Sequence, residues 1–459
     1  MSSTTYILAI NCGSSSIKAK LYAVNDAGKR KPLHAVAEGS IKGIAAKGQK
    51  IKIKLEWLDG SGHDISEEGE LGDQVDYQTL PPLLLKKFTS SSKGLKDEQI
   101  KYIAHRIVHG GPHKEPIIIT REHEEGLTEM DTLSEFAPLH NHSAVLAIRS
   151  CLKALPEHTS LLAFDTLFHQ TLPEEVYTYA IPKPDQEVPI PLRKVSKLHS
   201  LGIAQKLNLT PTRQYGFHGL SYRSILQSIA TKSGKQTKDV SIVVAHLGSG
   251  GSCCMIRNGE SQDTTMGLTP LEGLVGGTRS GSIDPTLVFH LVEGCAEDAG
   301  LDGIKVTRAE ATLNKKSGLT ALAGTNDFNS ITTKMLDPSS YDAKDAKAST
   351  LAYKVYTDRL LCYLTFYLGK LFETDGVDGI DGLVFSGGIG EKSVFLRKDI
   401  SKRLGWMGFQ VDDKLNEQAS AGKEVTIKIS GEASKIPVWV VQTDEEEVCA
   451  KMVQEYFDL

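Results

Sequence analysis

Two segments of this chain repeat one uncommon pattern, and the repeat limits the folds open to it. In residues 7–18 and 241–252 a short apolar run ends in one polar residue, Asn11 or His246, and glycines, serines and a second strand-like run follow. The pattern predicts a strand, a tight turn and a returning strand, twice. Such turns can surround an anion with backbone N–H groups and hydroxyls, because glycine leaves no Cβ in the way. We therefore expect polyphosphate to bind in a cleft between two related lobes.

The whole-chain numbers favour an intracellular protein of two domains or more. The chain has 459 residues, which exceeds one ordinary core. Its 52 basic and 57 acidic residues give a net charge of -5, which argues against general affinity for nucleic acid or an anionic membrane. No apolar run approaches the roughly 20 residues of a membrane span, and no signal-peptide pattern opens the sequence. We expect a cytoplasmic protein with reduced cysteines and no membrane or nucleic-acid partner.

Strand-like and helix-like segments interleave along the chain, which predicts an α/β class. Residues 341–372 are long enough for a substantial helix, and residues 438–441 form a short apolar strand. Residues 61–72 are acidic and glycine-rich, which favours a surface loop. The spacing at 443–446 is that of a capping box opening a final helix, with Thr443 at its N-cap.

Three glycine-bearing turns, around Gly13, Gly248 and Gly388, carry the phosphate-binding prediction. A P-loop is excluded at 387–393 because Glu391 stands where its second glycine belongs. A dinucleotide fingerprint is excluded at 248–253 because Cys253 replaces its third glycine. The arrangement that remains resembles the actin, Hsp70 and sugar-kinase superfamily, and implies two lobes of the actin-like (ribonuclease H-like) fold, with mixed sheets flanked by helices and a central cleft.

Candidate chemical groups lie among turn-forming residues. Arg106 and Arg279 are the best candidates for binding a carboxylate or a moving phosphoryl group, because a guanidinium stays charged and can bind two oxygens. His218, between Phe217 and Gly219, could donate to charge developing on a phosphoryl oxygen.

Seven segments, in order along the chain, resemble the acetate kinase family. They are NCGSSSIK (11–18), HRIVHGG (105–111), APLHN (137–141), FDT (164–166), GFHG (216–219), GTRSGSIDP (277–285) and SGGIGE (386–391). The resemblance implies reversible transfer of a phosphoryl group between ATP and acetate, giving acetyl phosphate and ADP. It also implies Mg²⁺ (or Mn²⁺) as cofactor and a homodimer.

The resemblance assigns roles to residues of this chain. The catalytic residues would be Asp165, His218, Arg279, Arg106 and His140. The acyl site would comprise Arg106, Val108, Leu139, Phe217 and Pro270. Asn11 and Glu445 would hold the metal. Nucleotide and phosphate would lie against Ser14, Ser16, Lys18, His246, Leu247, Gly248, Ser249, Gly250, Asp327, Phe328, Asn329, Gly388, Ile389, Gly390, Glu391 and Lys392.

The chain departs from the common family pattern at Ser249, where bacterial members usually have Asn, and at Asn329, where they usually have Arg. Both departures lie on the donor side, so the phosphoryl donor stays open between ATP and pyrophosphate. Pro112 and His142 also differ, on the acyl side.

The expected lobes are residues 1–165 with 446–459, and residues 166–445. Two other functions compete with an acetate kinase. One is a kinase for another short acid, such as propionate or butyrate. The other is a nucleotide-switched binding or filament protein of the actin and Hsp70 kind, which would not need two arginines and a histidine for transfer.

Overall fold

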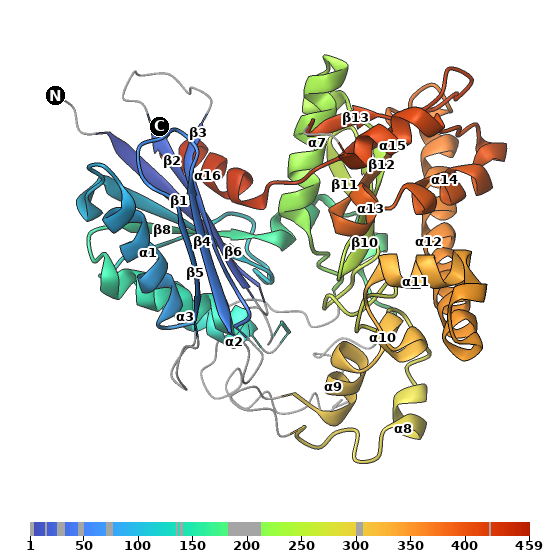
Figure 1. Cartoon of the computed structure of the whole chain (residues 1–459), viewed down its shortest axis with the longest axis horizontal. Helices are drawn as coiled ribbons and strands as arrows, with labels where there is room; N and C mark the ends of the chain where they lie inside the picture. Colours follow the sequence, from blue (N-terminus) through green and yellow to red (C-terminus); the bar gives the residue numbers. More distant parts are fainter. Residues whose placement is uncertain are drawn as a thin grey trace. The chain divides into compact units, whose positions relative to one another are not determined.

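The computed structural model describes residues 4–13, 16–24, 33–44, 50–69, 77–134, 136–137, 141–181, 213–299, 306–421 and 424–459. The described residues form two compact units (Figure 1). Unit 1 contains the described residues up to Leu167 together with 444–459, and unit 2 contains those from Phe168 to Thr443. None of the helices in the described ranges has both the length and the apolar character needed to cross a membrane.

The described part of unit 1 is built on an eight-stranded mixed sheet with the order β5-β4-β3-β2-β1-β6-β8-β7. Its strands are β1 (Thr5–Cys12), β2 (Ser16–Val24), β3 (His34–Lys42), β4 (Ile51–Trp57), β5 (Ile65–Gly69), β6 (Ile100–Ile107), β7 (Ile117–Ile119) and β8 (Thr159–Phe164). Its helices are α1 (Leu80–Ser91), α2 (Glu125–Leu133), α3 (Asn141–Ala154) and α16 (Glu445–Tyr456).

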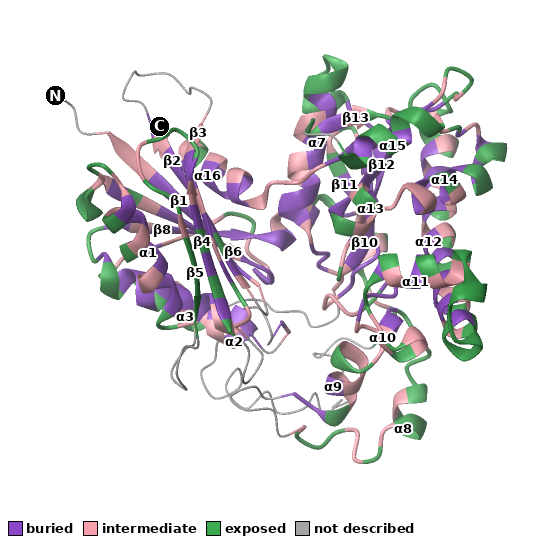
Figure 2. Cartoon of the chain, in the orientation of Figure 1, coloured by how far each residue is buried: buried purple, intermediate pink, exposed green. Residues whose placement is uncertain are grey.

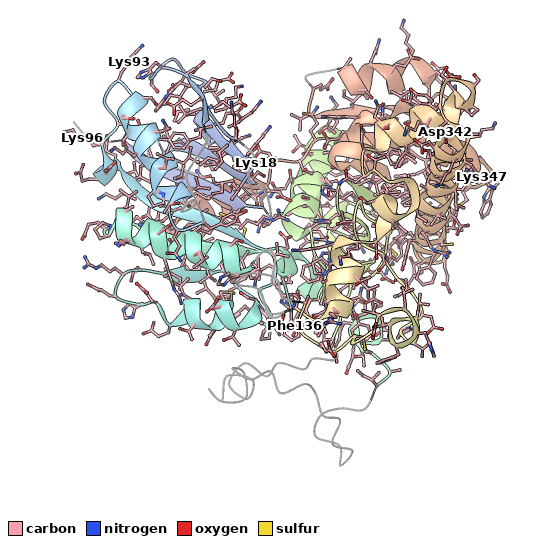
Figure 3. All side chains as sticks on the ribbon, turned by 60° about the horizontal axis from the view of Figure 1, so that its bottom comes forward. Lys18, Lys93, Lys96, Phe136, Asp342 and Lys347 are labelled. Atoms are coloured by element: carbon pink, nitrogen blue, oxygen red, sulfur yellow. The ribbon has the colours of Figure 1, made fainter. Side chains whose placement is uncertain are left out.

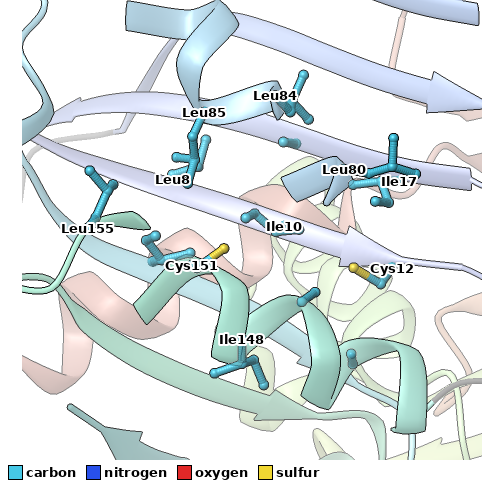
Figure 4. Close-up of a cluster of buried hydrophobic side chains, with 14 of the residues drawn as sticks. Leu8, Ile10, Cys12, Ile17, Leu80, Leu84, Leu85, Ile148, Cys151 and Leu155 are labelled. Carbon is cyan, nitrogen blue, oxygen red and sulfur yellow. The ribbon is translucent and has the colours of Figure 1, made fainter. Parts of the chain in front are cut away.

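Alternate residues of β1 face opposite sides of this sheet. Leu8, Ile10 and Cys12 belong to one buried cluster with Ile148 and Cys151 of α3 (Figure 4). Helix α16 packs against β1, β2 and β6. Because both faces are covered, β1 is almost continuously apolar, as expected of an interior strand.

The described part of unit 2 contains a six-stranded sheet with the order β11-β10-β9-β12-β14-β13. The strands are β9 (Ile242–Leu247), β10 (Gly251–Arg257), β11 (Glu260–Thr264), β12 (Gly382–Ser386), β13 (Thr426–Lys428) and β14 (Val438–Val441). The helices are α4 (Glu174–Tyr177), α7 (Gly219–Ser233), α8 (Leu287–Leu291), α9 (Arg308–Lys315), α10 (Gly318–Ala323), α11 (Phe328–Leu336), α12 (Ala343–Asp375), α13 (Gly387–Lys392), α14 (Val394–Arg403) and α15 (Asp413–Ala421).

Two helices cover opposite faces of this second sheet. Val243 and Ala245 of β9 join a buried cluster with Leu360 and other residues of α12. Val244, between them, joins a separate cluster with Ile225 of α7. In Figure 2 the strands of unit 2 are accordingly mostly buried, whereas α12 keeps exposed residues along its length.

The two sheets share one central topology. In unit 1, β1 pairs antiparallel with β2 and parallel with β6, which pairs parallel with β8. In unit 2, β9 pairs antiparallel with β10 and parallel with β12, which pairs parallel with β14. The predicted α/β class, with two mixed sheets flanked by helices and the hairpin repeated, is therefore confirmed.

Three local predictions have different outcomes. The long helix predicted at 341–372 is α12, which begins after Asp342, whose side chain accepts hydrogen bonds from two backbone N–H groups. The loop predicted at 61–72 is wrong in its middle, because β5 pairs there with β4 as a mostly exposed edge strand. The final helix α16 is capped by Asp444 rather than Thr443, since the Asp444 carboxylate accepts from the Glu447 N–H at 2.9 Å.

Candidate active site

The first predicted phosphate turn joins β1 to β2 in unit 1. The Gly13 N–H donates to the Ser16 carbonyl at 2.8 Å, which closes the turn. Lys18 is exposed on β2 and is paired across the hairpin with Asn11 (Figure 3). Ser14, a predicted phosphate ligand, lies outside the described residues.

Arg106, on β6, is held by side chains from three other elements. Its Nε and Nη2 donate to the two oxygens of Asp165 at 3.0 and 2.8 Å. Its Nη1 lies 2.7 Å from Oε2 of Glu445, at the start of α16, and 3.3 Å from Oδ1 of Asn11. Because β1, β6 and β8 are neighbours in the sheet, four predicted site residues meet at one edge.

The acidic side chains dominate the electrostatics of this cluster. Burial alone would lower the pKa of Arg106, but Asp165 and Glu445 outweigh burial and raise it. Glu446, buried beside them, also accepts from Nδ2 of Asn11 at 3.1 Å. Burial, followed by the charges of Glu445 and Asp444, raises the pKa of Glu446. The carboxyl groups of Asp165 and Glu445 therefore contact one guanidinium, and that of Glu446 contacts Asn11. This excess of carboxyl groups favours a further cation.

The donor atoms at this edge fit Mg²⁺ or Mn²⁺. No group of three or more His, Cys, Asp or Glu side chains in the described ranges could hold a metal ion by itself. Mg²⁺ needs fewer protein ligands, because one or two carboxylates together with phosphate oxygens and water usually complete its shell. The oxygens of Asn11 and Glu445 provide that kind of partial site, and the Asn11 Nδ2 donates to Glu445 at 2.9 Å.

The predicted acyl pocket is described only in part. Val108 is buried just after β6 in unit 1, Phe217 is buried in unit 2, and Pro270 of unit 2 is half-buried. Leu139 and His140 lie outside the described residues. The adjacent Asn141 is fully buried and exchanges two hydrogen bonds with the backbone of His109, at 3.0 and 2.8 Å. It therefore fixes the loop that follows Arg106 and Val108.

In unit 2, the second predicted phosphate turn lies against two other glycine-rich segments. A Cβ built on Gly387, which has φ +74°, would lie 2.6 Å from the Leu247 carbonyl oxygen, so only glycine permits this approach. The Gly277 N–H donates to the Ser249 carbonyl at 2.8 Å. The turns at 248–250, 276–279 and 387–390 are thus packed together. The predicted phosphate-binding residues here lie at the end of β9 (His246, Leu247), in the first turn (Gly248, Ser249, Gly250) and in the third turn (Gly388, Ile389, Gly390).

Two predicted catalytic side chains converge on this turn. A Cβ built on Gly250 would lie 3.0 Å from Nη1 of Arg279 and 3.7 Å from Nε2 of His218. The tips of the guanidinium and the imidazole therefore flank the same glycine. This geometry suits a ligand with several oxygens, which could accept hydrogen bonds from the turn and from both side chains.

Arg279 carries a charge that the described residues do not neutralise. In the part of the chain that the structure describes, its guanidinium has no carboxylate partner and no side-chain hydrogen bond. Burial lowers the pKa of Arg279 for that reason. An anion bound here would replace the missing counter-charge.

The backbone of His218 is strained. His218 has φ 58° in the left-handed region, which costs a non-glycine residue about 1–2 kcal/mol. Nε2 of the buried His169 forms a 2.9 Å hydrogen bond with the carbonyl of Phe217, the residue that precedes His218. Burial lowers the pKa of His169 to about 4, so it is neutral near pH 7. Strain of this kind persists where the surroundings hold it, typically at functional sites.

The remaining predicted nucleotide residues lie on two helices of unit 2. Asp327 caps α11 by accepting from the Asn329 N–H at 3.0 Å; Asp327 and Asn329 are exposed, whereas Phe328 is buried. Glu391 accepts from the Gly387 N–H at 3.0 Å across α13, and Lys392 is exposed at the end of that helix.

Sequence reasoning missed several residues that hold this site. Ser252 bonds Nδ1 of His218 at 2.8 Å. The fully buried Arg397 donates to the carbonyls of Gly390 and Glu391 at 2.8 and 2.6 Å, which fixes the end of α13. Ser252 stood within the repeated pattern and could have been suspected, whereas nothing in the local sequence of Arg397 signals its role.

The sequence profile of the Acetokinase family matches residues 6–451. The chain belongs to the acetokinase family. A protein of Cryptococcus neoformans var. neoformans serotype D named "Probable acetate kinase" is 50% identical over 455 residues, 99% of both chains. As a member of this family, the chain is a phosphotransferase that uses a carboxyl group as acceptor.

Solved structures agree with the family assignment. The acetate kinase of Entamoeba histolytica is 27% identical with a TM-score of 0.74, covering 99% of this chain and 100% of that one. A propionate kinase of Francisella tularensis subsp. tularensis is 29% identical with a TM-score of 0.73, covering 98% of both. The acetokinase architecture is thus found in kinases named for two different short acids.

Proposed function

We propose that this acetokinase transfers the γ-phosphoryl group of ATP directly to a carboxylate oxygen of acetate, reversibly and with Mg²⁺ (or Mn²⁺), giving acetyl phosphate and ADP. The observation that carries the proposal is the pair of side chains beside Gly250. They are the Arg279 guanidinium, which has no carboxylate partner in the described part of the chain, and the His218 imidazole. In the reaction, a bond forms between the acetate oxygen and phosphorus as the bond to the ADP oxygen breaks.

Unit 2 supplies the groups that stabilise the phosphoryl group in transit. Phosphoryl transfer needs mainly alignment and neutralisation of charge on the equatorial oxygens. Arg279 offers a permanent positive charge, and His218 offers a ring N–H as donor. The turn at 248–250 and the start of α13 provide backbone N–H groups for the phosphates of the nucleotide.

Unit 1 supplies a second arginine and a cation site for the same reaction. Asp165 grips Arg106 through two hydrogen bonds and thereby orients it, so its carboxylate acts on Arg106 rather than alone. Asn11 and Glu445 would hold Mg²⁺, which supplies charge neutralisation on the phosphates when bound. Ser14, Ser16 and Lys18 would contact the phosphates, and His140 would add a donor.

The acceptor is proposed to be acetate because the residues assigned to its methyl group are large and apolar. The resemblance assigns Val108, Leu139, Phe217 and Pro270 to that methyl group, and such apolar side chains would limit the length of the acyl chain. Propionate is the second candidate, since a propionate kinase has a similar overall structure to this chain. The family assignment favours either enzyme over a nucleotide-switched binding protein.

A hydroxamate assay tests the proposal. With Mg²⁺, acetate and ATP, we expect acetyl hydroxamate to form, and we expect chelation by EDTA to abolish it. Acetate should be used with a higher kcat/KM than propionate or butyrate. Pyrophosphate and GTP should be compared with ATP because Ser249 and Asn329 depart from the usual donor-side residues. Absence of acetate-dependent turnover with every donor would overturn the proposal.

Two further properties are proposed on the family resemblance alone. They are assembly as a homodimer and residence in the cytoplasm. Sedimentation at the mass of two chains would support the dimer, and cell fractionation would test the location.

A further inference from the structure

A short hydrogen-bonded chain links the imidazole of His218 to the interior of unit 2. Nδ1 of His218 lies 2.8 Å from Oγ of Ser252, on β10. The same Oγ lies 2.5 Å from the hydroxyl of Tyr222, on α7. Ser252 and Tyr222 are both fully buried, so water cannot substitute easily for either contact.

The hydrogen bond from Ser252 decides which nitrogen of His218 faces the ligand. Nδ1 is occupied by Ser252, whereas Nε2 lies beside Gly250 and Arg279. A serine hydroxyl has one proton to donate and can accept two. If Tyr222 donates to Ser252, the Ser252 proton goes to Nδ1, and the ring proton is left on Nε2, where it can be donated to a phosphoryl oxygen.

We propose that Ser252, oriented by Tyr222, is a positioning residue that turns Nε2–H of His218 toward the phosphate turn. This inference rests on the proposed function, because it assumes that His218 donates during phosphoryl transfer. It extends that function by assigning a role to two buried hydroxyls that lie behind the imidazole. Ser252 is held in place by β-sheet pairing opposite His246, so the hydroxyl has a rigid support.

The test compares Ser252→Ala in two backgrounds. In the wild-type background we expect kcat with acetate and ATP to fall about tenfold to 100-fold, the range for a misaligned catalytic group, with KM for acetate nearly unchanged. In the His218→Ala background the same substitution should add less than about twofold, because Ser252 acts through His218. Tyr222→Phe should give a smaller loss of kcat than Ser252→Ala, since the serine remains.

Ser349→Ala is the matched control. It removes another fully buried hydroxyl, on α12, whose oxygen has no hydrogen-bond partner among the described residues. We expect it to leave kcat and KM unchanged. An equal loss of kcat from Ser252→Ala in both backgrounds would mean a general structural role and overturn the inference, as would a Ser252→Ala enzyme with the wild-type kcat.

A second measurement does not depend on turnover. With ¹⁵N-labelled histidine, the signals of His218 can be assigned by their loss in His218→Ala, and we expect Ser252→Ala to shift the Nδ1 resonance and broaden both ring signals. Unchanged ring signals would contradict the positioning role even if the wild-type enzyme proved inactive with acetate. An inactive wild type whose His218 ring depends on Ser252 would instead count against the proposed function alone.

Discussion

Units 1 and 2 each contain one of the two arginines proposed for catalysis, and the two side chains lie in opposite electrostatic settings. Arg106 is clamped by Asp165 and Glu445, which raise its pKa. Arg279 has no such partner among the residues that the structure describes, and burial lowers its pKa. The Arg106 guanidinium therefore has its counter-charges within the fold, whereas the Arg279 guanidinium would gain one from a bound anion. Removal of Arg106 should therefore lower both stability and activity, whereas removal of Arg279 should lower activity alone.

The largest combined effect is expected for Arg106→Ala. Removing the guanidinium leaves the fully buried Asp165 without its cation, which should lower the free energy of unfolding by about 3–5 kcal/mol. Turnover should also fall at least ~100-fold. Denaturant unfolding and the hydroxamate assay measure both quantities.

The double variant Arg106→Ala/Asp165→Asn provides the control for this prediction. It should recover part of the lost stability, because the fully buried Asp165 carboxylate is no longer left without a cation, but none of the activity. If Arg106→Ala proved as stable as the wild type, the idea that Arg106 stabilises the buried Asp165 carboxylate in unit 1 would be wrong.

Arg279→Ala should separate the two properties. We expect kcat/KM to fall at least ~100-fold, in the range for loss of one transition-state donor. Stability should stay the same or rise slightly, because a buried charge without a partner is removed. Thermal unfolding without ligands, followed by the same assay, checks both. An Arg279→Ala enzyme with nearly intact turnover would contradict the contrast between the two arginines.

Gly250→Ala tests whether the tip of the Arg279 side chain acts beside Gly250. The new Cβ would lie 3.0 Å from Nη1 of Arg279, so that side chain must move, and kcat should fall about tenfold. Gly369→Ala on α12, where an added Cβ meets nothing within 4 Å, is the control and should leave kcat unchanged. Equal activity of the two variants would show that the tip of Arg279 does not work beside Gly250.

The smallest effect concerns buried histidines, which both units contain. Burial lowers the pKa of His105 to about 3 and that of His169 to about 4. The unfolded chain binds these protons near pH 6.5, so each histidine stabilises the fold fully above that pH and progressively less as the pH falls toward its folded pKa. Protonation of each histidine in the unfolded chain should lower the free energy of unfolding by about 1 kcal/mol between pH 6.5 and 5.5.

Unfolding free energies measured across this pH range test the prediction. His169→Gln should flatten the pH dependence by the amount that His169 contributes to it. A pH dependence that is the same in wild type and His169→Gln would mean that His169 is not buried in its neutral form.

The parts of the fold that the sequence predicted are those with a local signature. The repeated hairpin, the long helix α12 and the glycine turns each follow from adjacent residues. Strand β5 was missed because an edge strand needs only backbone pairing with β4, and its mostly exposed residues do not alternate in polarity. Asp444 was missed as a cap because two neighbouring residues had suitable side chains.

The site was predicted less completely, for a physical reason. Arg106 and His218 stand in distinctive segments, so their importance could be inferred. Their supports could not, because Asp165 reaches Arg106 across 59 residues and Ser252 reaches His218 across 34. Only the tertiary fold brings such partners together. Family resemblance supplied Asp165 but gave no indication of Ser252.

Helix α16 belongs to unit 1 but is translated after unit 2, and this order affects how the protein folds. Unit 1 needs α16 against β1 and β6, and its Glu445 completes the clamp on Arg106. That helix leaves the ribosome only after all of unit 2 has been translated. The N-terminal sheet must therefore wait, with one apolar face uncovered, for some hundreds of residues, so unit 2 can reach its native state first even though its translation begins later.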